Sequence, residues 1–298
     1  MTRSEVPDDY PLVVRRLPPS ARKAVLAGRL ERAKFAAVAA RHADDCASPA
    51  CSSWRWQPLS AASAPALATR HSAVVTARRV VTERAVRLRL AGQSLVGLTS
   101  LPAQDIEVIL NDGLGPPVKR RYAIRTLRSA VGEIDVDVVL HENGGPGSRW
   151  AAQAEISARV EFVGPCGKLE LLAAYWHLFV GDEAAVPATS ALCEALRSSA
   201  ASTAILQVAS EADRTPIASD HVRWVTRNGV PADTVELLRS AVDGFALPSW
   251  EGRAYLLGEG HTVGVLRDLL EARGLERNRI FAKGYWRARS ALQRERSA

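Results

Sequence analysis

The chain has 298 residues, of which 47% are hydrophobic and 24% charged, a composition typical of globular proteins that bury a sizeable core. No run approaches the ~18 uninterrupted apolar residues of a transmembrane helix, and the acidic first ten residues do not resemble a secretory signal, so we expect a cytoplasmic protein without a membrane partner. The net charge of +7 favours anionic partners, but the cations are scattered and aromatic residues make up only 6%, so we expect small anionic molecules and no nucleic acid.

Residues 1–70 form a predicted N-terminal extension that is partly helical. Residues 20–41 are rich in Ala, Leu, Arg and Lys, with apolar side chains at approximately helical spacing and Ser20 in the N-cap position. A basic helix can contact nucleic acid or a membrane, but it more often packs on the main body with a solvated basic face, which we favour. Residues 46–69 are dense in Ala, Ser and Pro, which is typical of a linker or an irregular wrap.

The four cysteines are Cys46, Cys51, Cys166 and Cys193. Cys46 and Cys51 are close enough in sequence to form a disulfide or half of a metal site. No second close pair completes a zinc or iron–sulfur set. We therefore expect free thiols, no metal held through sulfur, and no redox role for Cys166.

Short segments that alternate apolar and polar residues occupy the next part of the chain, from residue 71 to about 170. Strands are predicted over 72–80, 84–90, 105–110, 135–141 and 159–163, with another extended segment around 119–125. Many short strands without a long helix favour an antiparallel barrel or sandwich.

The periodicity changes from about residue 171, where strands begin to alternate with helices. Strands are predicted over 176–180, 204–208, 222–226, 253–257 and 279–282, and helices over 184–196, 232–242 and 263–273. This alternation predicts a parallel sheet covered by helices on both faces. We expect a β-barrel over 71–170 followed by a doubly wound nucleotide-binding domain over 171–298.

Two segments in the predicted barrel carry the strongest chemical pattern. Arg120 and Tyr122 lie two positions apart in an extended segment, so their side chains point the same way. A cationic fork beside a flat ring suits a ligand that carries both a phosphate and an aromatic system. The glycine-rich turn at 144–147 runs into Ser148, and its bare backbone N–H groups can approach a diphosphate closely. Together the two segments predict a flavin dinucleotide site.

The order of these features resembles the siderophore-interacting proteins, flavin-dependent ferric-siderophore reductases of the ferredoxin reductase-like superfamily. The resemblance covers about residues 71–290. It rests on seven motifs in order: Arg-Arg-Tyr-Ala-Ile-Arg at 120–125, Asp-Val-Val-Leu-His at 137–141, Gly-Pro-Gly-Ser-Arg-Trp-Ala at 145–151, Gly-Pro-Cys-Gly at 164–167, Gly-Asp-Glu-Ala-Ala-Val-Pro-Ala at 181–188, Gly-Glu at 258–259 and Lys-Gly-Tyr-Trp-Arg at 283–287. It implies an antiparallel FAD-binding barrel followed by a doubly wound NAD(P)-binding domain.

The resemblance also implies roles for individual residues in the barrel. Arg120 is expected to pair with the flavin phosphates, and Tyr122 to lie against the isoalloxazine ring. Arg125 is expected to line the flavin site. His141 and the pair Gly147 and Ser148 match positions that hold the ribityl, diphosphate or adenine part of the cofactor.

Ala123 departs from the family pattern, which normally has Ser or Thr here, with a hydroxyl near flavin N5. Without that donor, a backbone N–H or a water would take over the contact. Gly181, Asp182 and Glu183 are implied to form the entrance of the nicotinamide site, at the carboxyl end of the first parallel strand. The two acids immediately precede a predicted helix, so they equally suit N-terminal capping.

The resemblance implies that electrons pass from NAD(P)H through FAD to siderophore-bound Fe(III), because siderophores bind Fe(II) far less tightly. Ferric catecholates are strongly anionic, so Lys283 and Arg287 are the candidate substrate-binding residues, with Arg289 as a third. Alternatively, the intervening rings at 285–286 only cover the flavin or pack the domain junction, and the cations form a solvated tail.

Several functions remain open at this stage. The flavin could serve another acceptor, or the chain could be a non-enzymatic siderophore-binding protein with decayed flavin chemistry. DNA binding by residues 20–41 is disfavoured because no second recognition helix follows. The electron donor is NADH, NADPH or a ferredoxin, and Arg214, Arg223 and Arg227 are candidates for contacting a 2′-phosphate.

Overall fold

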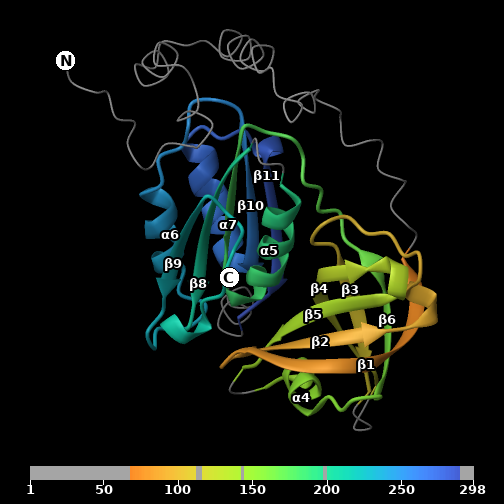
Figure 1. The fold of residues 1–298 in the computed structure, drawn as a ribbon. Helices are drawn as coiled ribbons and strands as arrows, with labels where there is room; N and C mark the ends of the chain where they lie inside the picture. The colour runs from red at the N-terminus through yellow and green to blue at the C-terminus, as the bar shows by residue number, and fades with distance from the viewer. Residues whose placement is uncertain (1–67, 112–115, 142–143, 197–199, 289–298) are drawn as a thin grey trace, which may run out of the picture.

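The computed structural model describes residues 68–111, 116–141, 144–196 and 200–288, which form a β-barrel and an α/β sheet (Figure 1). The predicted helix over 20–41, the pair Cys46 and Cys51, and Arg289 lie outside the described residues.

Six antiparallel strands close into the barrel in the order β1-β2-β5-β4-β3-β6. They are β1 (Thr69–Thr82), β2 (Ala85–Ala91), β3 (Asp105–Leu110), β4 (Val118–Arg128), β5 (Glu133–Val139) and β6 (Arg159–Cys166). The alternation in β2 shows why the barrel forms, because Val86, Leu88 and Leu90 point inward and are at most 1% exposed. The arginines between them face outward. The barrel prediction is therefore confirmed.

Helix α4 (Pro146–Gln153) lies between β5 and β6 and packs at one end of the barrel. The sequence predicted a turn here, but Pro146 and Gly147 begin a helix. Proline suits the first helical position because its φ is already helical and its missing N–H would have no partner there. Ala151, on the inner side of α4, joins the barrel core, so apolar packing favours the helix over an open turn.

The second part is an all-parallel sheet in the order β11-β10-β7-β8-β9. Its elements are β7 (Trp176–Gly181), α5 (Val186–Ala195), β8 (Ala201–Val208), β9 (His221–Thr226), α6 (Val235–Asp243), β10 (Gly252–Glu259), α7 (Gly260–Ala272) and β11 (Ile280–Trp286). Short 3₁₀ helices cover Gln93–Leu95, Ser129–Val131, Glu183–Ala185, Glu211–Asp213 and Arg277–Arg279.

Helices cover both faces of this sheet. Leu238 of α6 and Leu266 of α7 belong to one buried cluster, whereas Leu192 of α5 belongs to a second cluster with Phe179 and Tyr255. Helix α5 also packs against β4 of the barrel, so it lies between the two parts (Figure 1). The doubly wound prediction is confirmed.

The strand order reverses between β7 and β10. From β7 the chain continues outward to β8 and β9 and then returns to β10, on the other side of β7. Open α/β sheets bind ligands at the carboxyl ends of the strands at such a switch point. Here that edge comprises the residues that follow β7, β10 and β11.

Candidate functional site

Strand β4 and the start of α4 bring three of the predicted flavin residues together. Tyr122 is half-buried against Trp150 of α4, with ring centroids 5.7 Å apart, and burial raises the pKa of its hydroxyl to about 12. A Cβ on Gly147 would overlap the Tyr122 hydroxyl oxygen and would lie 3.5 Å from Cγ of Arg120. Arg120 is exposed and donates one hydrogen bond to the carbonyl of Lys119. The glycine therefore lets the helix approach the ring closely.

Ser148 uses its hydroxyl to join the end of β5 to α4. Its Oγ donates to the carbonyl of Val139 at 3.1 Å and accepts from the backbone N–H of His141 at 3.2 Å. The hydroxyl is thus occupied within the protein, and the His141 side chain is exposed. What this segment offers a ligand is the positive N-terminal end of α4, where backbone N–H groups favour a phosphate.

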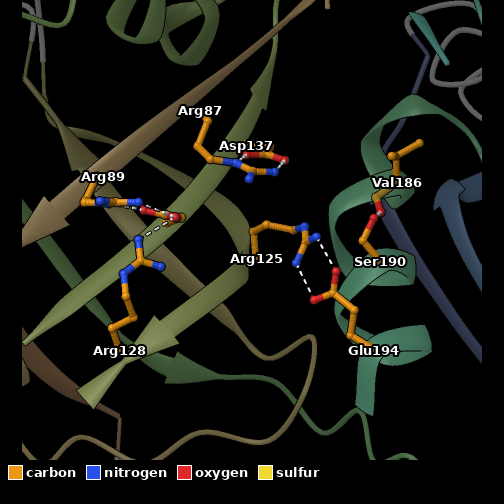
Figure 2. A network of polar contacts seen from close by, with 9 residues as sticks. Arg87, Arg89, Arg125, Arg128, Asp137, Val186, Ser190 and Glu194 are labelled. Carbon is orange, nitrogen blue, oxygen red and sulfur yellow. Dashed lines mark hydrogen bonds and ion pairs between the residues drawn. The ribbon is translucent and has the colours of Figure 1, made fainter. Parts of the chain in front are cut away.

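Arg125 connects the barrel to α5. Its guanidinium donates to both carboxylate oxygens of Glu194, at 2.5 and 2.8 Å, as Figure 2 shows. Beside this pair, Arg87 of β2 forms a two-point contact with Asp137 of β5 at 2.6 and 2.7 Å. The barrel therefore meets α5 through the ion pair of Arg125 and Glu194 and through apolar packing of Ala123 against the cluster that contains Leu192.

A pocket of about 490 Å³ lies at this junction. It is bounded by the hairpin of β1 and β2, by β4 and β5, by α5, and by the residues after β8; its walls include Arg79, Arg125, Glu183, Ser190, Asp213 and Arg214. The volume lies within the range of small-molecule and cofactor sites. Charged groups from both parts of the chain converge there.

The three arginines proposed for a 2′-phosphate occupy different surroundings. Arg214 lines the pocket and pairs with Glu211. Arg227 is buried and pairs with Glu183 at 2.5 Å, and Arg223 donates to the carbonyl of Ala241 at 3.1 Å. Of these three, Arg214 is the one that lines the pocket.

Asp182 lies at the switch point and is only 3% exposed. Its carboxylate accepts hydrogen bonds from the backbone of Ala184 at 2.9 Å, the backbone of Glu259 at 2.8 Å and the indole Nε1 of Trp286 at 2.8 Å. Burial, followed by the nearby charge of Glu183, raises the pKa of Asp182 to about 6. Capping is therefore shown for its side chain, which also joins three strand ends.

Two glycines make room for this arrangement. Gly258 has φ of +135°, and a Cβ there would lie 2.6 Å from the Asp182 Oδ2 atom. A Cβ on Gly181 would overlap the Ala185 side chain and the Leu257 carbonyl. Gly258 therefore requires glycine for its backbone conformation as well as for space, whereas Gly181 requires it because no side chain fits there.

The two predicted substrate cations differ in their surroundings. Lys283 forms an ion pair with Asp105 of β3 and lies 5.2 Å from the centroid of the Tyr285 ring, whereas the Arg287 side chain is exposed. Asp105 stands directly opposite Ala123 in the register of β3 and β4 and is almost fully buried. Lys283 thus holds β11 against the barrel beside Ala123.

Cys166 and Cys193 are free thiols. Burial raises the pKa of both, to about 12 for Cys193, and the charge of Asp105 adds to the effect at Cys166. Among the described residues, no cluster of three or more His, Cys, Asp or Glu side chains is placed to hold a metal ion. None of the described helices has the length and apolar character to cross a membrane.

Asp105 and Glu194 pair with two of the predicted residues but were not themselves predicted from the sequence. The one available signal for Asp105 was an acid at the start of an otherwise apolar strand. Glu194 gave no signal, because an acid on a helix is ordinarily solvated.

Comparison with known proteins identifies the family. Residues 85–169 match the model of the siderophore-interacting FAD-binding domain, and residues 174–289 match that of the siderophore-interacting proteins. The chain belongs to the siderophore-interacting protein family. The chain is 32% identical to the ferric vibriobactin reductase ViuB of Vibrio cholerae over 178 residues, which is 57% of this chain and 65% of ViuB. The NADPH-dependent ferric-chelate reductase of Escherichia coli is 27% identical over 53% of this chain and 62% of its own length.

Solved structures agree with the family. A siderophore utilization protein from T. fusca superimposes with a TM-score of 0.70 and 28% identity, covering 76% of this chain and 95% of that one. The siderophore-interacting protein SipS of Aeromonas hydrophila gives 0.65 and 25%, covering 77% and 97%. The chain spans about 65% of the length of the first curated relatives it matches.

Proposed function

We propose that this siderophore-interacting protein is an FAD-dependent ferric-siderophore reductase that takes electrons from NAD(P)H and releases iron as Fe(II). The observation that carries the proposal is the position of β4, which bears Arg120 and Tyr122: this strand packs against α5, and its Ala123 lies opposite Asp105, the partner of Lys283 at the switch-point edge of the α/β sheet. A flavin needs the arginine and the ring, and a nicotinamide donor needs the switch-point edge.

The residues of the barrel fit FAD. Arg120 and the N-terminal end of α4 would hold the diphosphate, and Tyr122 would lie against the isoalloxazine ring. The close approach of Gly147 to that ring supports this fit, because a side chain there would close the cradle. Bound FAD would supply the change from two-electron donation by NAD(P)H to one-electron reduction of Fe(III).

The pocket at the junction would accept the nicotinamide donor. Glu183, just after β7, lines this pocket from the α/β sheet, and Arg125 lines it from the barrel. The pairing of Arg125 with Glu194 would orient the guanidinium and keep α5 against the barrel. Ferredoxin is an alternative donor within the proposal, and the cytoplasm, where NAD(P)H is available, is the proposed location.

The C-terminal segment would bind the ferric siderophore. Arg287 is exposed at the end of β11 and would attract an anionic ferric catecholate. Lys283, beside Tyr285, would add positive charge for siderophore binding. Its ion pair with Asp105 keeps it at the junction between the barrel and the α/β sheet.

An absorption experiment under anaerobic conditions tests the proposal. The purified protein, supplied with FAD, should show oxidised-flavin bands that bleach with NAD(P)H and return when ferric siderophore is added, with Fe(II) captured by a ferrous chelator. Arg120→Ala should weaken FAD binding about tenfold, the effect of losing a charge-assisted hydrogen bond. Arg159→Ala, an exposed position on β6, is the matched control. Failure to take up FAD would refute the proposal, whereas turnover with quinones but not ferric siderophores would indicate a flavin reductase of another kind.

A further inference from the structure

Two buried carboxylates hold the segment that follows β11. Asp182 accepts the indole N–H of Trp286 at 2.8 Å. Glu259, which is 2% exposed, accepts the backbone N–H of Ala288 at 3.4 Å through Oε1 and that of Thr262 at 2.7 Å through Oε2. Arg287 lies between the two held residues and is itself exposed.

Burying the carboxylates of Asp182 and Glu259 costs free energy, which favours a role for them in positioning the chain. A buried carboxylate is unfavourable relative to an apolar side chain even when it is hydrogen-bonded. Asp182 collects donors from three places, the turn after β7 and the ends of β10 and β11. Gly258 adopts a backbone conformation with positive φ against this carboxylate. The carboxylate thus ties the outer strand β11 to the two central strands at their ligand-binding edge.

We propose that Asp182 and Trp286 are positioning residues for the ferric substrate: their hydrogen bond fixes the backbone that presents Arg287. The proposal rests on the proposed function, since it assigns Arg287 to an anionic ferric catecholate. Asp182 does not touch the substrate, because its carboxylate is enclosed. Its effect passes through the indole to the next residue of the chain.

Trp286→Phe tests the inference, because it keeps an aromatic ring and removes the indole N–H. The KM for ferric 2,3-dihydroxybenzoate should rise about tenfold, the effect of one hydrogen bond to a charged group. Reduction of the bound flavin by NAD(P)H in the first half-reaction should change less than the KM does, because Trp286 does not line the pocket proposed for the donor. Trp224→Phe on β9, the opposite edge strand, is the matched control.

Coupling to Arg287 separates positioning from a general structural effect. Arg287→Ala should raise the same KM, and adding Trp286→Phe to it should raise the KM little further, because the fixed backbone then carries no cation. Asp182→Asn should retain most affinity, since its amide oxygen can still accept from Trp286 and Glu259. Additive effects of Trp286→Phe and Arg287→Ala, or an unchanged KM in Trp286→Phe, would overturn the proposal.

A binding measurement distinguishes failure of this inference from failure of the proposed function. The gallium(III) complex of 2,3-dihydroxybenzoate cannot be reduced in place of iron, so its Kd is independent of turnover. A Kd that rises about tenfold in Trp286→Phe supports the inference, even if the unaltered protein proves not to reduce iron. An unchanged Kd in a variant that retains its melting temperature contradicts the inference, even if reduction proceeds.

Discussion

Gly147→Ala probes the close approach between α4 and β4. Gly147 is the second residue of α4, and its new methyl group would overlap the hydroxyl oxygen of Tyr122. The Tyr122 ring cannot turn away freely, because Trp150 of α4 packs against it and both rings contact the barrel core. The substitution therefore forces the ring or the first turn of the helix to shift, at the place where FAD is proposed to bind.

The structure also sets the size of the stability loss in Gly147→Ala and predicts that removing the Tyr122 hydroxyl reverses it. Overpacking of this kind costs about 1–3 kcal/mol, from which the helix preference of alanine over glycine recovers up to about 1 kcal/mol. We expect a net loss of about 1–2 kcal/mol in the free energy of unfolding. The next ring atom, Cζ of Tyr122, would lie at 3.4 Å from the methyl group, an ordinary contact. In a Tyr122→Phe background, Gly147→Ala should therefore cost close to nothing.

Urea denaturation of the four proteins in this cycle measures the coupling, and FAD titration should show weaker binding in Gly147→Ala alone. Gly264→Ala in α7 is the control, because a Cβ there meets nothing within 4 Å and should stabilise the protein by about 0.5–1 kcal/mol. Equal losses from Gly147→Ala with and without the Tyr122 hydroxyl would refute the reasoning, because the hydroxyl would then not be the obstacle.

Two further predictions concern charged groups. Asp182, with Glu183 and Glu259 beside it, has a pKa of about 6 in the folded state against an ordinary 3.8, so it binds its proton more tightly when the protein is folded. Its contribution to the free energy of unfolding therefore falls as pH rises from about 4 through about 6, by about 3 kcal/mol in all. The unfolding free energy of Asp182→Asn minus that of the unaltered protein should rise by about 2.4 kcal/mol between pH 4 and 7. A difference independent of pH would contradict this prediction. The pair of Arg125 and Glu194 should show a coupling energy of about 0.5–1 kcal/mol in a double-mutant cycle by urea denaturation, because Glu194 is half exposed. High salt should reduce it, and a coupling unaffected by salt would count against the ion pair.

Local patterns predicted most of the fold. Alternation in β2 placed Leu88 and Leu90 inside, and the change to strands separated by helices correctly predicted the parallel sheet. Helix α4 was not predicted because the glycines and proline at 144–147 are typical of a turn. Packing of Ala151 in the barrel core stabilises the helix instead.

Contacts between distant residues could not be predicted from the sequence. Lys283 and Asp105 are 178 positions apart, and Trp286 and Asp182 are 104 positions apart. Each pair forms only because the tertiary fold brings Lys283 of β11 to Asp105 of the barrel and Trp286 to the end of β7. A pattern of neighbouring residues carries no information about such partners. The sequence therefore predicted that Asp182 follows the first parallel strand, but not that it accepts a hydrogen bond from Trp286.

The raised pKa of the two described thiols bears on how this protein would withstand Fe(II), the product of the proposed reaction. Fe(II) reacts with oxygen to give peroxide, and peroxide oxidises the thiolate form of cysteine. Cys193 is buried on α5, and Cys166 lies beside the buried Asp105, so both remain protonated at neutral pH. Under the proposed function, the surroundings that keep these thiols neutral also protect the junction between barrel and sheet from oxidative damage.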